Sequence, residues 1–343
     1  MASNYTPELR QDCLTNTWVA CAPRRSGRPM KTGPDAISHD PADDTPVEGC
    51  PFCPGHEDDL PGILWEHEAP NDRPWATRVV PNKYPALSDA PPTVTSAENG
   101  LYRTRPSTGR QEVIIDTPYH YQGLAQMSVA QVEAVLYTYR ERYAALRTDA
   151  PSLYPFVFRN HGRRAGASLP HPHSQIIATD VRPPRIEREE AAAQARYDDT
   201  GQCPYCEMIA TELDAEVRMV WQDDHAVMFV PYAAQVPCEL WILPRRHDPE
   251  FGRMTDAERT SVATALQQAS QRYYTRLDDP AVNLYVRTAL EYNTDAPHLH
   301  WSLRLQPRTS RKAGFERSTG MQINPSIPER DAALLREDPP SAA

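Results

Sequence analysis

Two histidines lie two residues apart in the stretch SLPHPHSQII, which covers residues 168–177. If this stretch is a β-strand, His171 and His173 point to the same face, because side chains alternate along a strand. Two imidazoles on one face are suited to binding a metal ion, to nucleophilic attack, or to one role each. The proline between them fixes φ and favours an extended backbone.

Two C-x-x-C pairs, Cys50/Cys53 and Cys203/Cys206, precede further histidines in the chain. In a reducing compartment such pairs are more typical of metal or redox sites than of structural disulfides. Each pair is followed by a histidine at the end of a strand and then by a His-x-His stretch, which together supply enough ligands for tetrahedral zinc. Neither pair follows a strand in a βαβ unit, as a thioredoxin-like redox motif would, so zinc is favoured over redox chemistry.

We therefore expect two Zn²⁺ sites with four protein ligands each, which makes both sites structural because no position stays open for a reactant. The expected ligands are Cys50, Cys53, His120 and His171 in the first site, and Cys203, Cys206, His247 and either His300 or His298 in the second.

If His171 binds metal, His173 remains free on the same face and is a nucleophile when its imidazole is neutral. The loop before it is rich in groups that donate hydrogen bonds to phosphate oxygens, and a glutamine follows on the same strand face. These donors are Asn160, Arg163, Arg164, Ser168 and Gln175. The constellation predicts nucleotidyl transfer through a covalent phosphorus–nitrogen intermediate. The residues alone leave a second interpretation open, in which both histidines bind metal and the loop is only a turn.

The elements that must position these residues occur twice. From Cys50 the order is CPFC, a strand, a second strand ending in His, a long helical stretch, a further strand, and LPHPHSQIIAT. From Cys203 the same order runs from CPYC to PHLHWSLRL. Two copies of one supersecondary unit explain this order. Hairpin-connected strands beside one helix predict an α+β fold made of antiparallel sheets with helices packed on them.

Each unit contains a long helix with a defined start. Ser128 and Thr255 precede apolar residues at helical spacing, and Gln131 and Glu258 stand at capping-box positions. We expect an N-terminal catalytic domain over residues 1–184 and a second domain over residues 185–343. The last stretch, residues 324–343, is expected to be frayed.

The composition of the 343 residues is that of an ordinary globular protein, with room for two domains. The net charge is −10 and no basic block is present, so nucleic acid is not an expected partner. No apolar run is long enough to span a membrane and the start lacks a secretory pattern, so we expect a cytoplasmic protein without a membrane partner. The three other cysteines, Cys13, Cys21 and Cys238, are expected to be buried as small apolar residues.

The stretch LPHPHSQIIA resembles the active-site motif of the galactose-1-phosphate uridylyltransferase family, within the histidine-triad superfamily. The resemblance covers most of the chain and includes CPFCPG, RVVPNKYPAL, NHGRRAGASLPHPHSQ, PYAAQVPCELWILPRRH and AGFERSTGMQINPSIPE. It implies two histidine-triad-like repeats with a joined antiparallel sheet, usually in a homodimer.

By this resemblance His173 is the nucleophile, Gln175 supports the covalent nucleotidyl-histidine, and Ser168 contacts phosphate. The other substrate contacts that it implies are Arg25, Arg28, Asn82, Asn160, Glu316 and Gln322. The family can use the two N-terminal arginines from the partner subunit. The second metal set resembles that of a plant relative, ADP-glucose phosphorylase, in which the position of His300 is a ligand. Other members use a glutamate between the repeats, and Glu189 falls at that place.

The resemblance implies exchange of UMP between UDP-glucose and galactose 1-phosphate, with a covalent uridylyl-histidine and ping-pong kinetics. The expected partners are therefore a nucleotide sugar and a sugar 1-phosphate. One alternative is an ADP-sugar phosphorylase or adenylyltransferase with the same histidine chemistry. Another is a non-catalytic nucleotide-binding protein that is stabilised by structural zinc.

Overall fold

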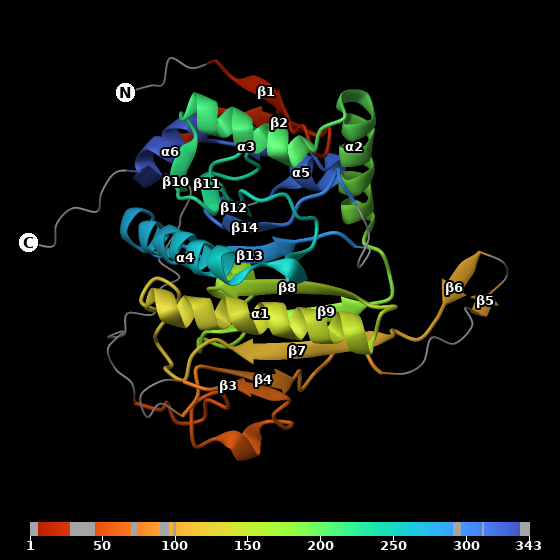
Figure 1. Ribbon diagram of the computed structural model, residues 1–343, viewed down its shortest axis with the longest axis vertical. Coiled ribbons are helices and arrows are strands. Elements are labelled where there is room, and N and C mark those ends of the chain that lie inside the picture. Colours follow the sequence, from red (N-terminus) through yellow and green to blue (C-terminus); the bar gives the residue numbers. More distant parts are fainter. Residues whose placement is uncertain are drawn as a thin grey trace, which may run out of the picture.

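The computed structural model describes residues 6–27, 45–69, 74–89, 96–98, 101–290, 296–310 and 312–336. Arg28, one of the expected substrate contacts, lies outside these residues. Within them, the chain forms one large antiparallel sheet with two long helices on one face, a small sheet, and a projecting hairpin (Figure 1).

The large sheet is built from two sets of strands that follow the same spatial order. In the first repeat this order is β3-β4-β7-β9-β8, and in the second it is β10-β11-β12-β14-β13. The bounds are β3 (Trp65–His67), β4 (Thr77–Pro81), β7 (Gly109–Ile115), β8 (Tyr154–His161), β9 (His173–Thr179), β10 (Met219–Gln222), β11 (Ala226–Phe229), β12 (Leu240–Pro244), β13 (Val282–Arg287) and β14 (Ser302–Pro307). The predicted duplication is confirmed by this shared order.

The two repeats join where β8 pairs with β13. The pairing is antiparallel, with Val282 opposite His161 and Asn283 opposite Asn160. Every other pair in this sheet is antiparallel as well, among the strands of the described residues. The join places residues of the second repeat beside the loop that follows β8, which is the expected phosphate loop.

Helices α1 (Val129–Asp149) and α4 (Asp256–Arg276) lie side by side on one face of the sheet (Figure 1). The Ser128 side chain accepts a hydrogen bond from the Gln131 N–H, and Thr255 forms a full capping box with Glu258. Both predicted helix starts are therefore confirmed. Apolar side chains of both helices and of the strands beneath them form the main core, because every second residue of a strand faces the helices.

Shorter elements complete the described structure. They are the α-helices α2 (Pro184–Thr200), α3 (Pro204–Ala215), α5 (Gly314–Thr319) and α6 (Pro328–Arg336), the 3₁₀ turns η1 (Pro23–Gly27), η2 (Glu57–Asp59), η3 (Arg163–Ala165) and η4 (Phe251–Arg253), and the hairpin of β5 (Ser96–Glu98) and β6 (Tyr102–Thr104). The expectation of a frayed end is wrong for residues 324–336. Helix α6 packs against α4 and β10 and buries Ala332 and Leu335 completely.

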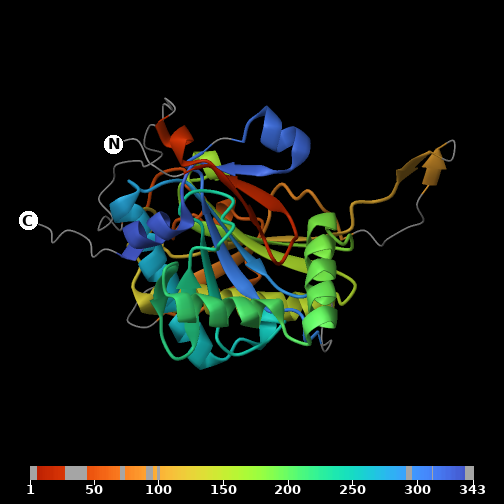
Figure 2. The ribbon, with the colours of Figure 1, turned by 90° about the horizontal axis from the view of Figure 1, so that it is seen from above.

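A three-stranded sheet brings the start and the end of the described chain together. Its order is β1 (Glu8–Gln11), β2 (Trp18–Cys21), β15 (Gln322–Asn324), and β15 runs parallel to β2. Figure 2 shows β1, β2 and α5 on the side of the large sheet opposite α1. Leu14, between β1 and β2, packs into a core formed by the second repeat. The N-terminal strands thus lie on the second repeat, and the division at residues 184/185, which coincides with the start of α2, stays a prediction.

No helix of the described residues is long and apolar enough to cross a membrane. Cys21 and Cys238 are buried as expected. Cys13 is exposed, contrary to the expectation, because it lies in the turn between β1 and β2.

Candidate active site and metal centres

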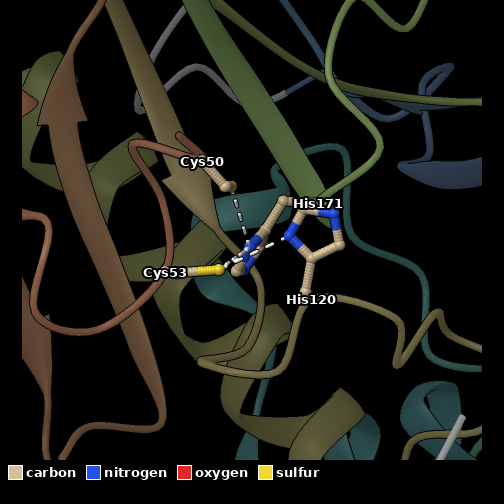
Figure 3. A group of neighbouring side chains, drawn as sticks. All are labelled: Cys50, Cys53, His120 and His171. Carbon is tan, nitrogen blue, oxygen red and sulfur yellow. Dashed lines mark hydrogen bonds between the residues drawn. The ribbon is translucent and has the colours of Figure 1, made fainter. Parts of the chain in front are cut away.

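Four buried side chains converge at the edge of the first repeat (Figure 3). The Cys53 Sγ lies 3.4 Å from the His120 Nδ1, and the His171 Nδ1 lies 3.6 Å from both Cys50 Sγ and Cys53 Sγ. A tetrahedral zinc ion with usual bond lengths holds sulfur and nitrogen ligands about 3.5 Å apart. The four residues expected as the first site therefore fit a zinc ion without rearrangement.

A second group of possible ligands contains Cys203, Cys206 and His247. Cys203 stands just before α3 and Cys206 in its first turn, and the Cys206 Sγ lies 3.4 Å from the His247 Nδ1. The structure brings these three ligand atoms within 4.8 Å of one another. It thus assembles three of the four expected ligands of the second site.

His300 lies beside this group but not within it. Its Nδ1 donates to the Trp301 carbonyl, and its buried Nε2 has no hydrogen-bond partner among the described residues. The rings of His247 and His300 are T-shaped with centroids 5.7 Å apart, as the rings of His120 and His171 are at 5.1 Å. The two ring pairs are thus arranged alike, but His300 would offer Nε2 to a metal ion where His171 offers Nδ1. The Nδ1 of the alternative ligand, His298, is also buried and without a hydrogen-bond partner among the described residues.

Glu189, the other alternative ligand, is engaged elsewhere. Its buried carboxylate accepts a hydrogen bond from Arg304, and Arg287 Nε lies 3.4 Å from its second oxygen. Burial opposes ionisation, but the two arginines lower the pKa of Glu189 below its usual value. The carboxylate thus balances two buried cations rather than joining the cysteines.

His171 and His173 use opposite ring nitrogens. The His171 Nε2 donates to the Thr117 carbonyl at 2.8 Å, which leaves its Nδ1 directed at the two sulfur atoms. The His173 Nδ1 donates to the His171 carbonyl at 2.8 Å. Because a carbonyl only accepts, the proton of neutral His173 is on Nδ1 and its Nε2 carries a lone pair.

His173 is 7% exposed, at the start of β9. Burial lowers the pKa of His173 below its usual value, although the hydrogen bond to His171 raises it. The ring of Phe52, from the first C-x-x-C turn, packs edge-on against His173 with centroids 5.5 Å apart. The expected nucleophile is thus neutral at physiological pH and is supported by the same turn that carries Cys50 and Cys53.

A buried polar network lies beneath His173, on the helix side of the sheet. Ser174 Oγ donates to Asp116, and Arg159 Nε donates to Asp116 Oδ2 at 2.8 Å. Tyr139 of α1 lies 2.5 Å from Ser174 Oγ. Because Ser174 faces α1, the alternation of the strand directs His173 to the opposite face. Sequence patterns did not indicate Asp116, although it directly follows β7, four residues before His120.

The expected phosphate loop leaves the end of β8 on the same face as His173. Asn160 Oδ1 accepts a 2.9 Å hydrogen bond from Asn283 of β13. Arg163 and Arg164 lie in η3, and Ser168 is exposed in the turn before β9. His161 points to the helix side, where its Nε2 lies 2.9 Å from the Asp279 carboxylate.

Gln175 shares the face of His173, as expected from the strand pattern. Its Oε1 accepts a 3.1 Å hydrogen bond from Gln111 of β7. Gln111 in turn accepts from the N–H of Ala86, in the segment that follows Asn82 at the end of β4. Asn82 is half-buried, and its Oδ1 accepts from the Tyr84 N–H. The structure therefore links the Asn82 segment to Gln175 through Gln111, which sequence patterns did not indicate.

The remaining expected substrate contacts gather around the small sheet. Arg25 is exposed in η1 after β2, Glu316 caps α5 through the Ala313 N–H, and Gln322 begins β15. Among the described residues, no hydrogen bond or ion pair joins these three side chains to β9 or to the phosphate loop.

A family model described as "Galactose-1-phosphate uridyl transferase, N-terminal domain" matches residues 1–183, and a second one, described as a domain of unknown function, matches residues 123–335. The chain is also 30% identical over 341 residues to galactose-1-phosphate uridylyltransferase of Thermotoga maritima, covering 96% of this chain and 98% of that one. This chain belongs to the galactose-1-phosphate uridylyltransferase family. The resemblance stated from the sequence is thereby confirmed, and so is the class of enzyme, a nucleotidyltransferase.

A relative named for a different activity is similar as well. ADP-glucose phosphorylase of Arabidopsis thaliana is 33% identical over 339 residues, covering 97% of this chain and 93% of the relative. The crystal structure of an Arabidopsis ADP-glucose phosphorylase with bound ADP-glucose superposes with a TM-score of 0.81 at 30% identity, covering 97% of this chain and 99% of that one. The expected α+β fold is confirmed by this similarity.

Proposed function

We propose that this uridylyltransferase-family enzyme exchanges UMP between UDP-glucose and galactose 1-phosphate through a covalent uridylyl-His173. The observation that carries the proposal is the hydrogen bond from His173 Nδ1 to the His171 carbonyl. It fixes the tautomer in which Nε2 is unprotonated, and burial keeps that nitrogen neutral. His173 is therefore a nucleophile that needs no separate base.

In the first step, Nε2 forms a bond to the α-phosphorus of UDP-glucose, and the bond from that phosphorus to the β-phosphate oxygen breaks. Glucose 1-phosphate leaves with that electron pair. In the second step, a phosphate oxygen of galactose 1-phosphate attacks the same phosphorus and the phosphorus–nitrogen bond breaks. Asn160, Ser168, Gln175, Arg163 and Arg164 supply donors for the negative charge that develops on the phosphoryl oxygens.

The first Cys/His group would hold Zn²⁺ through Cys50, Cys53, His120 and His171. The second would use Cys203, Cys206, His247 and, through its Nε2, His300. Zinc would fix the C-x-x-C turns and the strand ends, and its four ligands leave no position for substrate. The first zinc ion would also support the position of His173, because Phe52 lies between Cys50 and Cys53 and its ring contacts His173.

The direct test is incubation with UDP-glucose labelled at the α-phosphate and without an acceptor. The enzyme should release one glucose 1-phosphate per active site and retain an acid-labile label. His173→Ala should retain none. Labelling that persists without His173 would show that the nucleophile is wrong, and a purified, folded wild type that is never labelled would favour a non-catalytic binding protein.

A second candidate is an ADP-sugar phosphorylase, in which phosphate takes AMP from an adenylyl-His173 and gives ADP. The second Cys/His group supports it, since the sequence resembles ADP-glucose phosphorylase in these residues. Parallel incubation with UDP-glucose and ADP-glucose distinguishes the candidates, because only the true donor releases glucose 1-phosphate without an acceptor.

Two further properties stay predictions. A homodimer is expected because the family can take arginines such as Arg25 from the partner subunit, and light scattering on the purified protein tests it. A cytoplasmic location is expected, and cell fractionation tests it.

A further inference from the structure

Asn160 and Gln175 are the two expected phosphate contacts with a side-chain amide, and an amide has two chemically different ends. Their nitrogen donates hydrogen bonds and their oxygen only accepts them. A phosphate oxygen is an acceptor, so each amide assists the reaction only when its nitrogen faces the phosphate. If the proposed function is correct, something must therefore fix the orientation of both amides.

For Asn160 the orientation follows from Asn283. The Asn283 Nδ2 lies 2.8 Å from the Ala165 carbonyl, which only accepts. The amide nitrogen of Asn283 must therefore be at this position, and its second hydrogen is donated to the Asn160 Oδ1 at 2.9 Å. The Asn160 nitrogen is thereby turned toward the phosphate loop, where a Cβ added at Gly166 would lie 3.5 Å from it.

For Gln175 the orientation follows from Gln111. The Ala86 N–H only donates, so the atom that it meets at 3.0 Å is the Gln111 oxygen. The Gln111 nitrogen then donates to the Gln175 Oε1 at 3.1 Å. The Gln175 nitrogen is left to donate to a phosphoryl oxygen.

We propose that Asn283 and Gln111 are positioning residues that turn the donating ends of Asn160 and Gln175 toward the phosphate. A backbone group fixes the orientation of Asn283 and of Gln111, and each of these amides in turn fixes the orientation of one amide at the site. Asn283 comes from the second repeat, so this repeat takes part in the chemistry of the first although its own His-x-His stretch lacks a phosphate loop.

The geometry of the loop explains why such a restraint is useful. Gly162 and Gly166 both have positive φ values, 78° and 99°. Glycine adopts positive φ without strain but about as readily as negative φ, so the two glycines alone do not fix the loop conformation. Two residues of the second repeat restrain this loop. Asn283 donates to Asn160 and to the Ala165 carbonyl, and the Asp279 carboxylate contacts the His161 imidazole.

The test exchanges each positioning amide for a carboxylate of the same shape, in Asn283→Asp and Gln111→Glu. A carboxylate accepts and does not donate, so it recruits the nitrogen of Asn160 or Gln175 and turns the oxygen toward the phosphate. Binding of UDP-glucose and of ADP-glucose is measured by calorimetry in the His173→Ala background, where no transfer occurs. We expect affinity for the donor that binds the parent to fall about ten- to a hundred-fold, the effect of one hydrogen bond to a charged group.

Two comparisons separate this role from a structural one. Asn283→Ala removes the hydrogen bond to Asn160 without reversing the Asn160 amide. It should therefore weaken donor binding less than Asn283→Asp does. In an Asn160→Ala background, Asn283→Asp should have little further effect. Gln11→Glu is the matched control, because Gln11 also donates to a backbone carbonyl, that of Asn16, but on β1 and in solvent.

The proposal is overturned if Asn283→Asp and Gln111→Glu bind both donors within about two-fold of the parent, or if the loss with Asn283→Asp is undiminished in the Asn160→Ala background, since independent sites are additive. Because binding is measured without His173, these outcomes do not depend on the labelling experiment. Failure of the proposed transfer reaction is therefore distinguishable from failure of the positioning role.

Discussion

At the scale of single residues, two histidines separated by one proline have different chemistry because different ring nitrogens carry the proton. His171 gives its Nε2 proton to the Thr117 carbonyl and turns Nδ1 to the sulfur atoms. His173 gives its Nδ1 proton to the His171 carbonyl and keeps the Nε2 lone pair. The backbone carbonyl of His171, the expected metal ligand, thus fixes the tautomer of His173, the proposed nucleophile.

The tautomer and burial of His173 set the expected pH dependence of transfer. Attack requires neutral His173, and burial lowers its pKa below the ordinary 6.5. Protonation therefore blocks His173 at a lower pH than it would block a free histidine. The single-turnover rate of nucleotidyl-enzyme formation should therefore decline toward acid along a limb whose midpoint lies below the ordinary 6.5. An acid limb centred clearly above this value would contradict the assignment.

Beneath His173, the buried pair of Asp116 and Arg159 predicts a large effect on stability. Asp116 is fully buried, and Asp116→Ala would leave the Arg159 cation buried without a partner. We expect the free energy of unfolding to fall by about 3–5 kcal/mol, measured by denaturant titration. Asp89→Ala is the control, because Asp89 pairs with Arg110 in solvent and should cost less than about 1 kcal/mol. Equal losses in both variants would contradict this explanation.

At the scale of elements, the first C-x-x-C turn connects the proposed metal group to the proposed nucleophile. Phe52 contacts His171 and His173 with centroid distances of 6.0 and 5.5 Å. Tyr205, at the same place in the second turn, has its ring centroid 6.2 Å from that of His300. The two turns are alike, and His300 also has an unpaired Nε2, but among the described residues the expected phosphate loop lies beside the first turn's histidine.

This difference predicts separable effects of two matched substitutions. Cys50→Ser should remove one metal ion, lower the melting temperature and abolish transfer, because Phe52 and His173 lose their support. Cys206→Ser should remove the other ion and lower the melting temperature, but leave transfer measurable below that temperature. Elemental analysis, thermal unfolding and labelling at His173 provide the three readouts. Complete loss of labelling in a folded Cys206→Ser variant would contradict the structural role of the second group.

Local patterns predicted the elements whose cause is local. Ser128 and Thr255 marked the starts of α1 and α4 because a helix end needs an acceptor for its free N–H groups. The pairing of β2 with β15 was not predictable, because it joins residues about 300 positions apart and neither strand alternates strongly. The role of Asn283 was hidden for the same reason, since it depends on the register between β8 and β13. The site residues that were predicted are those in short motifs, and the residues that orient them come from neighbouring strands.

At the scale of the whole molecule, the two repeats differ in what covers the face used by His173. In the second repeat, Arg304 of β14 lies over the Trp241 ring at 3.9 Å and pairs with Glu189 of α2. Tyr205 of α3 also donates to Glu189. Side chains of α2 and α3 thus occupy the face where the first repeat presents His173 and Gln175, which supports the proposal that the reaction takes place in the first repeat.

The placement of Arg25 predicts that two chains build one site. Arg25 follows β2 in the small sheet, which is attached to the second repeat, whereas His173 begins β9 in the first. In the proposed homodimer, Arg25 of one subunit would meet the nucleotide bound at His173 of the other. Arg25→Ala should therefore lower transfer strongly, since an arginine contact to phosphate is lost.

Complementation tests this arrangement directly. When Arg25→Ala and His173→Ala chains are co-expressed, half of the dimers are mixed, and each mixed dimer has one site with both residues intact. Activity should recover to about a quarter of the wild-type value, as expected for a symmetric dimer with two shared sites. If each site is formed within one chain, mixing restores nothing, because every chain then lacks one of the two residues that its own site requires.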